Sequence, residues 1–99
     1  NEVIRRVAAR QAATLVEVEQ RLAGASPGGV IGASLMLEHV HPNLDGYFLL
    51  ADAFHDAFLE SGIAGAPQVV VEEAEARREM PVSEVDRWLG EYKAAKIRA

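Results

Sequence analysis

The stretch LEHVHPNLDGY, residues 37–47, concentrates more chemistry than any other part of this 99-residue chain. Glu38 stands three residues before His41. This spacing lets a carboxylate in a tight turn accept the imidazole Nδ1–H and leave Nε2 available as a base. Pro42 disfavours the α region for the residue before it, so we expect His41 on an extended turn outside any helix. Glu38 and His41 are therefore the first candidate catalytic pair.

The residues after the proline predict a helix that runs to Ser61. Asn43 is a natural N-cap, and Gly62 is placed to end the helix as its C′ residue. Gly46 costs about 1 kcal/mol of helix propensity relative to Ala, which leaves two explanations open: a close approach of the backbone to the preceding turn, or a loose first turn. The helical period predicts an inner stripe of Tyr47, Leu50, Ala51, Phe54 and Phe58, and a mostly outward acidic face of Asp45, Asp52, Asp56 and Glu60.

Residues 38–51, EHVHPNLDGYFLLA, resemble the last catalytic block of the SGNH (GDSL-type) hydrolases, in which an acid-x-x-His-Pro turn precedes a helix carrying Gly and Leu-Ala. The likeness covers about residues 2–62 and is weak beyond them. It implies His41 as the catalytic base and Glu38 as its orienting acid. The family's acid is usually Asp, so the extra methylene of Glu requires the turn to hold this side chain slightly further back.

The resemblance implies an α/β fold, with this chain as the C-terminal segment of a three-layer α/β/α (flavodoxin-like) hydrolase, helix-rich with one short strand. Residues 1–62 would belong to the hydrolase domain, and residues 63–99 would form a C-terminal helical extension. The family's Gly-Asp-Ser-type nucleophile block and the Gly and Asn of its oxyanion hole are missing from the sequence. We therefore expect a piece of a longer serine esterase that acts on small acyl or O-acetyl esters without a cofactor, and that is inert alone.

The serines of the chain offer no obvious nucleophile. They are Ser26, Ser34, Ser61 and Ser83, and none lies in a Gly-x-Ser-x-Gly elbow. Ser34 is the nearest to His41 in sequence, but a serine in the same loop as its base is expected to cap or solvate that loop.

The N-terminal part of the chain predicts a helix and a strand. Residues 1–11 place Val3, Ile4, Val7, Ala8 and Gln11 on one helical face. Residues 13–18 form a short apolar, β-branched run that predicts a buried parallel strand, with a helix as the alternative at this length. Residues 19–23 predict a helical turn closed by Gly24. Residues 25–34 predict a loop, whose glycines lack the spacing of a phosphate-binding loop.

Two further helices are expected near the C-terminus. A hinge at residues 65–67 precedes the first, over residues 68–79, with Val70, Val71 and Ala74 inward and a break at Met80-Pro81. Ser83 and Asp86 approach a capping box at the start of the second. Its apolar stripe comprises Val85, Trp88, Leu89, Tyr92 and Ile97. This stripe is expected to pack on the rest of the hydrolase, on the first helix or on another chain.

Two alternatives to the catalytic reading stay open. His39 and His41 are spaced like paired metal ligands, with Glu38 and His55 as possible additions. Alternatively, the chain is a small helix-rich interaction module whose stripe over residues 85–97 binds a partner helix or another copy of the chain.

Composition restricts the partners. The chain has 10 basic and 15 acidic residues and a net charge of −5, which disfavours a nucleic-acid surface. The absence of cysteine excludes disulfides, thiolate nucleophiles and cysteine metal sites. No apolar run reaches the roughly 18 residues of a membrane span.

Overall fold

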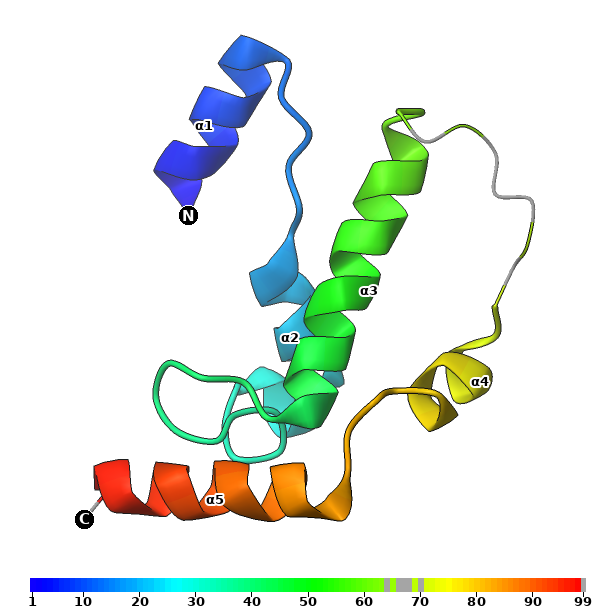
Figure 1. The fold of residues 1–99 in the computed structure, drawn as a ribbon. Helices are drawn as coiled ribbons and strands as arrows, with labels where there is room; N and C mark the ends of the chain where they lie inside the picture. Colours follow the sequence, from blue (N-terminus) through cyan, green and yellow to red (C-terminus); the bar gives the residue numbers. More distant parts are fainter. Residues whose placement is uncertain (64, 66–68, 70, 99) are drawn as a thin grey trace.

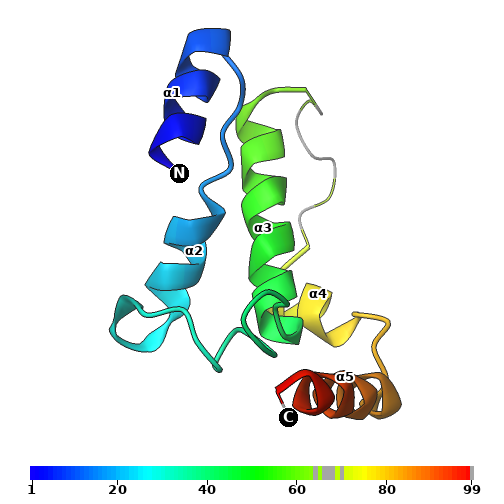
Figure 2. The same ribbon diagram turned by 90° about the vertical axis from the view of Figure 1, so that its left-hand side faces the viewer.

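The computed structural model describes residues 1–63, 65, 69 and 71–98 of the chain. Within these ranges the elements are α1 (Glu2–Gln11), α2 (Val18–Ala25), the 3₁₀ turn η1 (Pro27–Gly29), α3 (Leu44–Glu60), α4 (Glu73–Arg78) and α5 (Glu84–Arg98). Figures 1 and 2 show α2 alongside α3, with α1 and α5 at opposite ends of the molecule.

The predicted α/β fold is wrong for the described part of the chain, which is helical. Residues 12–17 connect α1 to α2 without strand pairing, and Val18 is already the first residue of α2. A strand needs a neighbouring strand to satisfy its N–H and C=O groups, and the described residues provide none here. Their strand-type pairing is limited to an isolated antiparallel bridge between Met36 and Pro42. Apolar, β-branched composition over six residues therefore did not decide the structure.

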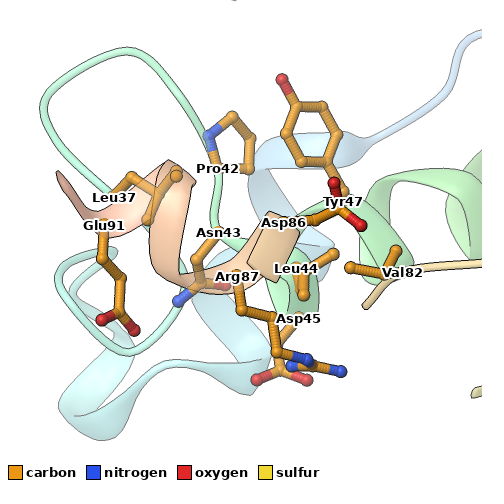
Figure 3. Close-up of a pocket in the computed structure, with 11 residues that line it drawn as sticks. Leu37, Pro42, Asn43, Leu44, Asp45, Tyr47, Val82, Asp86, Arg87 and Glu91 are labelled. Atoms are coloured by element: carbon orange, nitrogen blue, oxygen red, sulfur yellow. The ribbon is translucent and has the colours of Figure 1, made fainter. Parts of the chain in front are cut away.

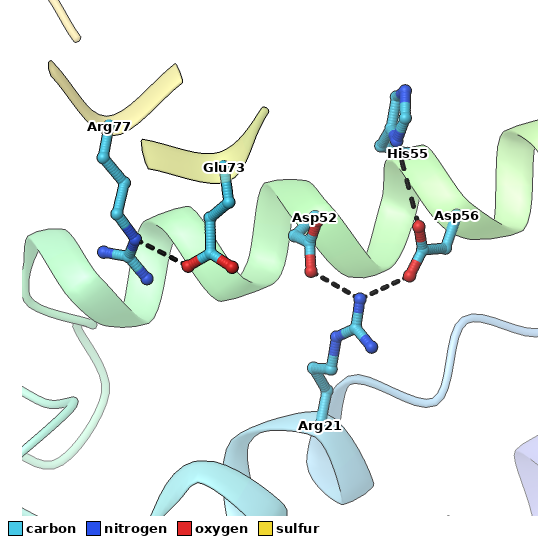
Figure 4. Close-up of polar contacts among 6 residues, drawn as sticks. All are labelled: Arg21, Asp52, His55, Asp56, Glu73 and Arg77. Atoms are coloured by element: carbon cyan, nitrogen blue, oxygen red, sulfur yellow. Dashed lines mark hydrogen bonds and ion pairs between the residues drawn. The ribbon is translucent and has the colours of Figure 1, made fainter. Parts of the chain in front are cut away.

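α2 and α3 form the main helix pair. Their buried apolar side chains are Leu22, Ala53 and Ala57. Arg21 of α2 reaches across the pair, with Nη2 2.5 Å from Oδ2 of Asp52 and a second ion pair to Asp56 (Figure 4). These two aspartates, predicted to point mostly outward, therefore face α2. α2 also continues through Gly24, which was predicted to close it, and ends at Ala25.

The stripe of α3 predicted to face inward lies mostly at the surface. Its large side chains are about half exposed, at 49% for Tyr47, 55% for Phe54 and 52% for Phe58. Of the predicted stripe, only Leu50 is half-buried. α3 carries apolar residues on more than one face, so its period alone does not determine which face packs. The alanine face packs because small side chains let the backbones of two helices approach closely.

α1 forms at the predicted place but without the predicted apolar packing. Val3, Ile4 and Val7 are 61%, 58% and 53% exposed. The helix is instead attached to the following segment by Arg5, whose Nε and Nη2 donate to the two carboxylate oxygens of Glu17 at 2.8 and 2.9 Å. This bidentate pair holds the pKa of Glu17 below its usual value. The pairing of Arg5 depends on a residue beyond the helix, so the periodicity of α1 could not predict it.

α4 is shorter than the helix predicted over residues 68–79, and begins at Glu73. Most of the predicted hinge at 65–67, together with Gln68 and Val70, lies outside the described residues. Val71 and Ala74, predicted to face inward, are exposed. The predicted break at Met80-Pro81 is confirmed, since α4 ends at Arg78.

Arg77 attaches α4 to the start of α3. Its guanidinium pairs with Glu73 of its own helix and with Asp45 of α3, both at 2.8 Å. The same group lies 4.0 Å from the centre of the Phe48 ring. Figure 4 shows Arg77 and Glu73 projecting from α4 toward α3. α4 is thus held by one polar side chain more than by apolar burial.

α5 begins with the predicted cap. The Ser83 hydroxyl donates to Asp86 Oδ2 at 2.6 Å, the Ser83 N–H donates to the same oxygen at 2.9 Å, and the Asp86 N–H donates to the Ser83 hydroxyl at 3.2 Å. These bonds satisfy backbone donors at the helix start. They also hold the pKa of Asp86 below its usual value, with the Ser83 hydroxyl as the largest cause.

Most of the apolar stripe of α5 faces outward, with Val85 70% and Trp88 67% exposed, whereas Ile97 at its end lies toward the turn. Instead, α5 docks on the turn that precedes α3 through its opposite face, where Ala94 is only 3% exposed. Gly90 lies beside Leu37, since a Cβ there would be 3.8 Å from Leu37 Cδ1. Figure 1 shows α5 crossing beneath this turn, far from α1. The expected packing of the stripe on the first helix is therefore wrong.

The described chain has a thin core. Its radius of gyration is 15.9 Å, whereas a compact domain of about 100 residues has about 13 Å. Apart from the small residues of the α2–α3 pair and Ala94, the buried apolar residues are Leu22 and Leu35. None of the helices in the described ranges has the length and hydropathy needed to cross a bilayer. Most large apolar side chains of these helices remain available for contacts outside the described residues.

Candidate functional site

The candidate site is a turn closed by backbone hydrogen bonds on both sides. The Leu37 N–H donates to the His41 carbonyl at 2.8 Å, and the Asn43 N–H donates to the Leu35 carbonyl at 2.9 Å. These bonds bring the two arms of the turn together at the Met36–Pro42 bridge. His41 thus lies outside the helix, as the following proline predicts.

The turn is joined rigidly to α3. Asn43 is the N-cap, as predicted: its Oδ1 accepts from the Gly46 N–H at 2.9 Å. Its Nδ2 donates in turn to the Ser34 carbonyl at 3.0 Å. A Cβ on Gly46 would lie 2.8 Å from Pro42 Cβ and closer still to the Leu35 carbonyl oxygen. Of the two explanations for this glycine, close backbone approach is confirmed.

Glu38 is the buried centre of the turn, with its side chain 2% exposed. Its carboxylate accepts from the Val40 N–H at 2.9 Å and from the His41 N–H at 3.1 Å. Burial acts to raise the pKa of Glu38, but the hydrogen bonds from the His41 imidazole and the Val40 N–H outweigh it. The pKa of Glu38 therefore lies below its ordinary 4.5, and the carboxylate stays charged at neutral pH.

His41 is held in the orientation that the Glu38-x-x-His41 spacing predicts. Its Nδ1 hydrogen bonds to Glu38 Oε1. With Nδ1–H donating to a carboxylate, the neutral ring has its lone pair on Nε2. The side chain is 60% exposed, so the ring is accessible from solvent. The arrangement is an oriented base with a buried anion behind it.

His39 shares the same carboxylate, a relationship that spacing did not single out. Its Nδ1 lies 2.8 Å from Glu38 Oε2, while its side chain is 77% exposed. Two imidazoles therefore flank one buried anion. A signal was present in the 38–41 segment, because two histidines at i+1 and i+3 can both reach back to residue 38 in a closed turn.

The serines do not complete a catalytic triad within the described residues. The Ser26 hydroxyl donates to the Leu22 carbonyl at 2.8 Å, and the Ser61 hydroxyl donates to the Phe58 carbonyl at 2.7 Å. The Ser83 hydroxyl caps α5. Ser34 is exposed, and its carbonyl accepts from Asn43. Each serine is thus placed in a loop or at a helix end, as capping residues are.

The structure does not bring His39 and His41 together with further side chains into a set of metal ligands within the described residues. In the part of the chain that the structure describes, no group of three or more His, Asp or Glu side chains is arranged to hold an ion. His55, considered as an additional ligand, lies on α3 and has Asp56 as its neighbour at 3.9 Å (Figure 4).

α5 adds residues to the site that the sequence did not suggest. A hollow of about 250 Å³ lies between the Glu38–His41 turn and the C-terminal half of α5, where Lys93 and Ile97 line it. A neighbouring hollow of about 410 Å³ lies along the N-terminal half of α5. Figure 3 shows the polar side chains of this second hollow: Asn43, Asp45, Asp86, Arg87 and Glu91.

Comparisons of the chain with protein-family models, with curated proteins and with solved structures find no match.

Proposed function

We propose that this chain supplies the base and the orienting acid of a serine ester hydrolase of the SGNH type, with the nucleophile outside these 99 residues. The observation that supports the proposal is the hydrogen bond between His41 Nδ1 and the buried Glu38 carboxylate. That bond leaves Nε2 as the basic nitrogen on an exposed ring.

In this function His41 Nε2 takes the proton of the serine hydroxyl as the oxygen attacks the ester carbonyl. The resulting imidazolium then gives that proton to the leaving alcohol oxygen. Glu38 stabilises the imidazolium and fixes the tautomer. Water attacks the acyl-enzyme in the second half of the cycle, and His41 accepts and returns a proton in the same way. The 99-residue chain alone should be inert, because a base without nucleophile and oxyanion donors offers little catalysis.

The test is hydrolysis of p-nitrophenyl acetate by the product of the intact gene. His41→Ala should lower turnover on the order of 10⁴-fold. Glu38→Gln should cause a large loss too, since an amide neither fixes the tautomer nor balances the imidazolium charge. Glu38→Asp should keep part of the activity. His39→Ala is the matched control, because it removes a histidine from the same carboxylate and leaves the base in place.

Two results would refute the proposal. One is near-normal turnover in His41→Ala; the other is hydrolysis by the isolated 99-residue chain that His41→Ala does not affect.

A second candidate function, a non-catalytic interaction module, is favoured by the outward face of α5. Trp88 and Tyr92 stack with their ring centres 6.0 Å apart, and are 67% and 48% exposed. Rigid exposed aromatics are common anchors of protein interfaces. Sedimentation of the chain over a range of concentrations tests this function. Association that Trp88→Ala removes would support it, and a monomer at all concentrations would count against it.

A further inference from the structure

We propose that the hollow between the Glu38–His41 turn and α5 binds the aliphatic acyl group of the substrate, and that Lys93 holds its carboxylate in the released product. This inference rests on the proposed function, because it specifies the substrates of that function as esters of short aliphatic acids. The binding itself requires no nucleophile and is measurable on the chain alone.

The walls of the hollow are mainly apolar and come from two distant parts of the sequence. Leu37, Pro42 and Tyr47 line it from the turn and the start of α3, and Ala94 and Ile97 line it from α5. Tyr47 and Ile97 are 49% and 59% exposed, so an alkyl chain placed here would cover apolar surface that now faces water. Such a surface favours an aliphatic group over a sugar or a nucleotide.

The polar groups of the hollow determine which head group of an aliphatic ligand can bind there. Glu38, His41 and Lys93 line it, and the Glu38 carboxylate already accepts two backbone N–H groups and the His41 ring. The ion pairs in the described part of the chain do not include the Lys93 ammonium, and Lys93 is exposed. Lys93 is therefore the cation available to an anionic ligand. A product carboxylate bound to Lys93 would lie in the same hollow as His41. This is where the proposed ester hydrolysis releases its acid.

The position of α5 makes this hollow possible. Gly90 lies beside Leu37 of the turn, and Ala94, one helical turn later, is buried and lines the hollow together with Leu37. Lys93 and Ile97 lie on the same C-terminal half of α5 and line the hollow as well. Residues of the C-terminal extension thus become specificity determinants for a base that lies some 50 residues earlier in the chain.

The experiment is an NMR titration of the ¹⁵N-labelled 99-residue chain with sodium hexanoate and, separately, with 1-hexanol. Hexanoate should produce saturable shifts at His41, Tyr47 and Ile97 with millimolar affinity. Hexanol, which has the same chain length and no charge, should bind at least fivefold more weakly. Lys93→Gln should weaken hexanoate binding about fivefold to tenfold and leave hexanol unchanged. Ile97→Ala should weaken both ligands.

Lys96→Gln is the matched control. Lys96 lies on the same helix but its ammonium is over the Tyr92 ring at 5.3 Å, and it does not line the hollow. Equal affinity for hexanol and hexanoate, or hexanoate binding that survives Lys93→Gln, would overturn the proposal. Failure here is distinct from failure of the esterase function, which is decided by turnover of His41→Ala in the intact gene product.

Discussion

Gly46 and Leu35 are packed so closely that a Cβ atom on residue 46 would collide with the Leu35 carbonyl oxygen. The first turn of α3 therefore rests directly on the arm of the turn that carries Glu38. This contact fixes the position of the candidate base relative to the helix behind it.

Gly46→Ala should destabilise the chain for this reason. Overpacking costs about 1–3 kcal/mol, which exceeds the gain of about 1 kcal/mol in helix propensity. Urea unfolding followed by circular dichroism measures the difference. Gly24→Ala in α2 is the control: no atom lies within 4 Å of its added Cβ, so this change should stabilise the chain. A stabilising Gly46→Ala would mean that α3 does not rest on the turn.

Asn43→Ala should cost about 1 kcal/mol of unfolding free energy, because the Gly46 N–H loses its acceptor. Asn43→Asp separates the two roles of this side chain. An aspartate still caps the helix but cannot donate to the Ser34 carbonyl, so it should recover most of the loss. If Asn43→Asp is as damaging as Asn43→Ala, the bond to Ser34 is the more important one.

The stability of the chain should fall as the pH is lowered through the region below 4.5, in part because of Glu38. Its pKa is lowered in the folded chain, so the unfolded state binds the proton more readily. The ionised Glu38 carboxylate contributes to the free energy of unfolding above the pKa that Glu38 has in the unfolded chain. This contribution is lost as the pH falls through the lower pKa of Glu38 in the folded chain. Urea midpoints measured between pH 6 and pH 3 should therefore decline less steeply in Glu38→Gln than in the wild type. Parallel declines would show that Glu38 is not held as a charged group.

Arg21→Gln should weaken the α2–α3 pair by about 0.5–1 kcal/mol at low salt, because partly exposed ion pairs contribute little. The guanidinium serves Asp52 and Asp56 together, so either single change, Asp52→Asn or Asp56→Asn, should cost less than Arg21→Gln. Raising the ionic strength should reduce the difference between wild type and variant. A loss that does not depend on salt would indicate that the stem of Arg21, not its charge, holds the helices.

Local features of the site were predictable from the sequence because each depends on neighbours along the chain. The Asn43 cap, the Ser83–Asp86 capping box and the Glu38–His41 hydrogen bond all join residues at most three positions apart. Residue identity and spacing are sufficient for such contacts.

Features that depend on distant partners were not predictable. The segment 13–18 has the composition of a strand but no neighbouring strand in the described structure. The face of α3 that packs is decided by α2, through Ala53 and Ala57, and not by the larger aromatic side chains. Lys93 joins the hollow near His41 because α5 crosses the turn, and periodicity carries no information on that crossing.

The closed turn before α3 makes the length of this segment a constraint. The Leu37–His41 and Asn43–Leu35 hydrogen bonds and the close contact of Gly46 with Leu35 hold the two ends of this loop together. They therefore fix the number of residues that the loop can contain. One inserted residue between Leu37 and Pro42 would break that pairing and rotate the imidazole away from its carboxylate. In natural variants of this chain, substitutions within the loop should therefore be more common than insertions or deletions. The loop should also be transferable to other helix N-termini as a single unit.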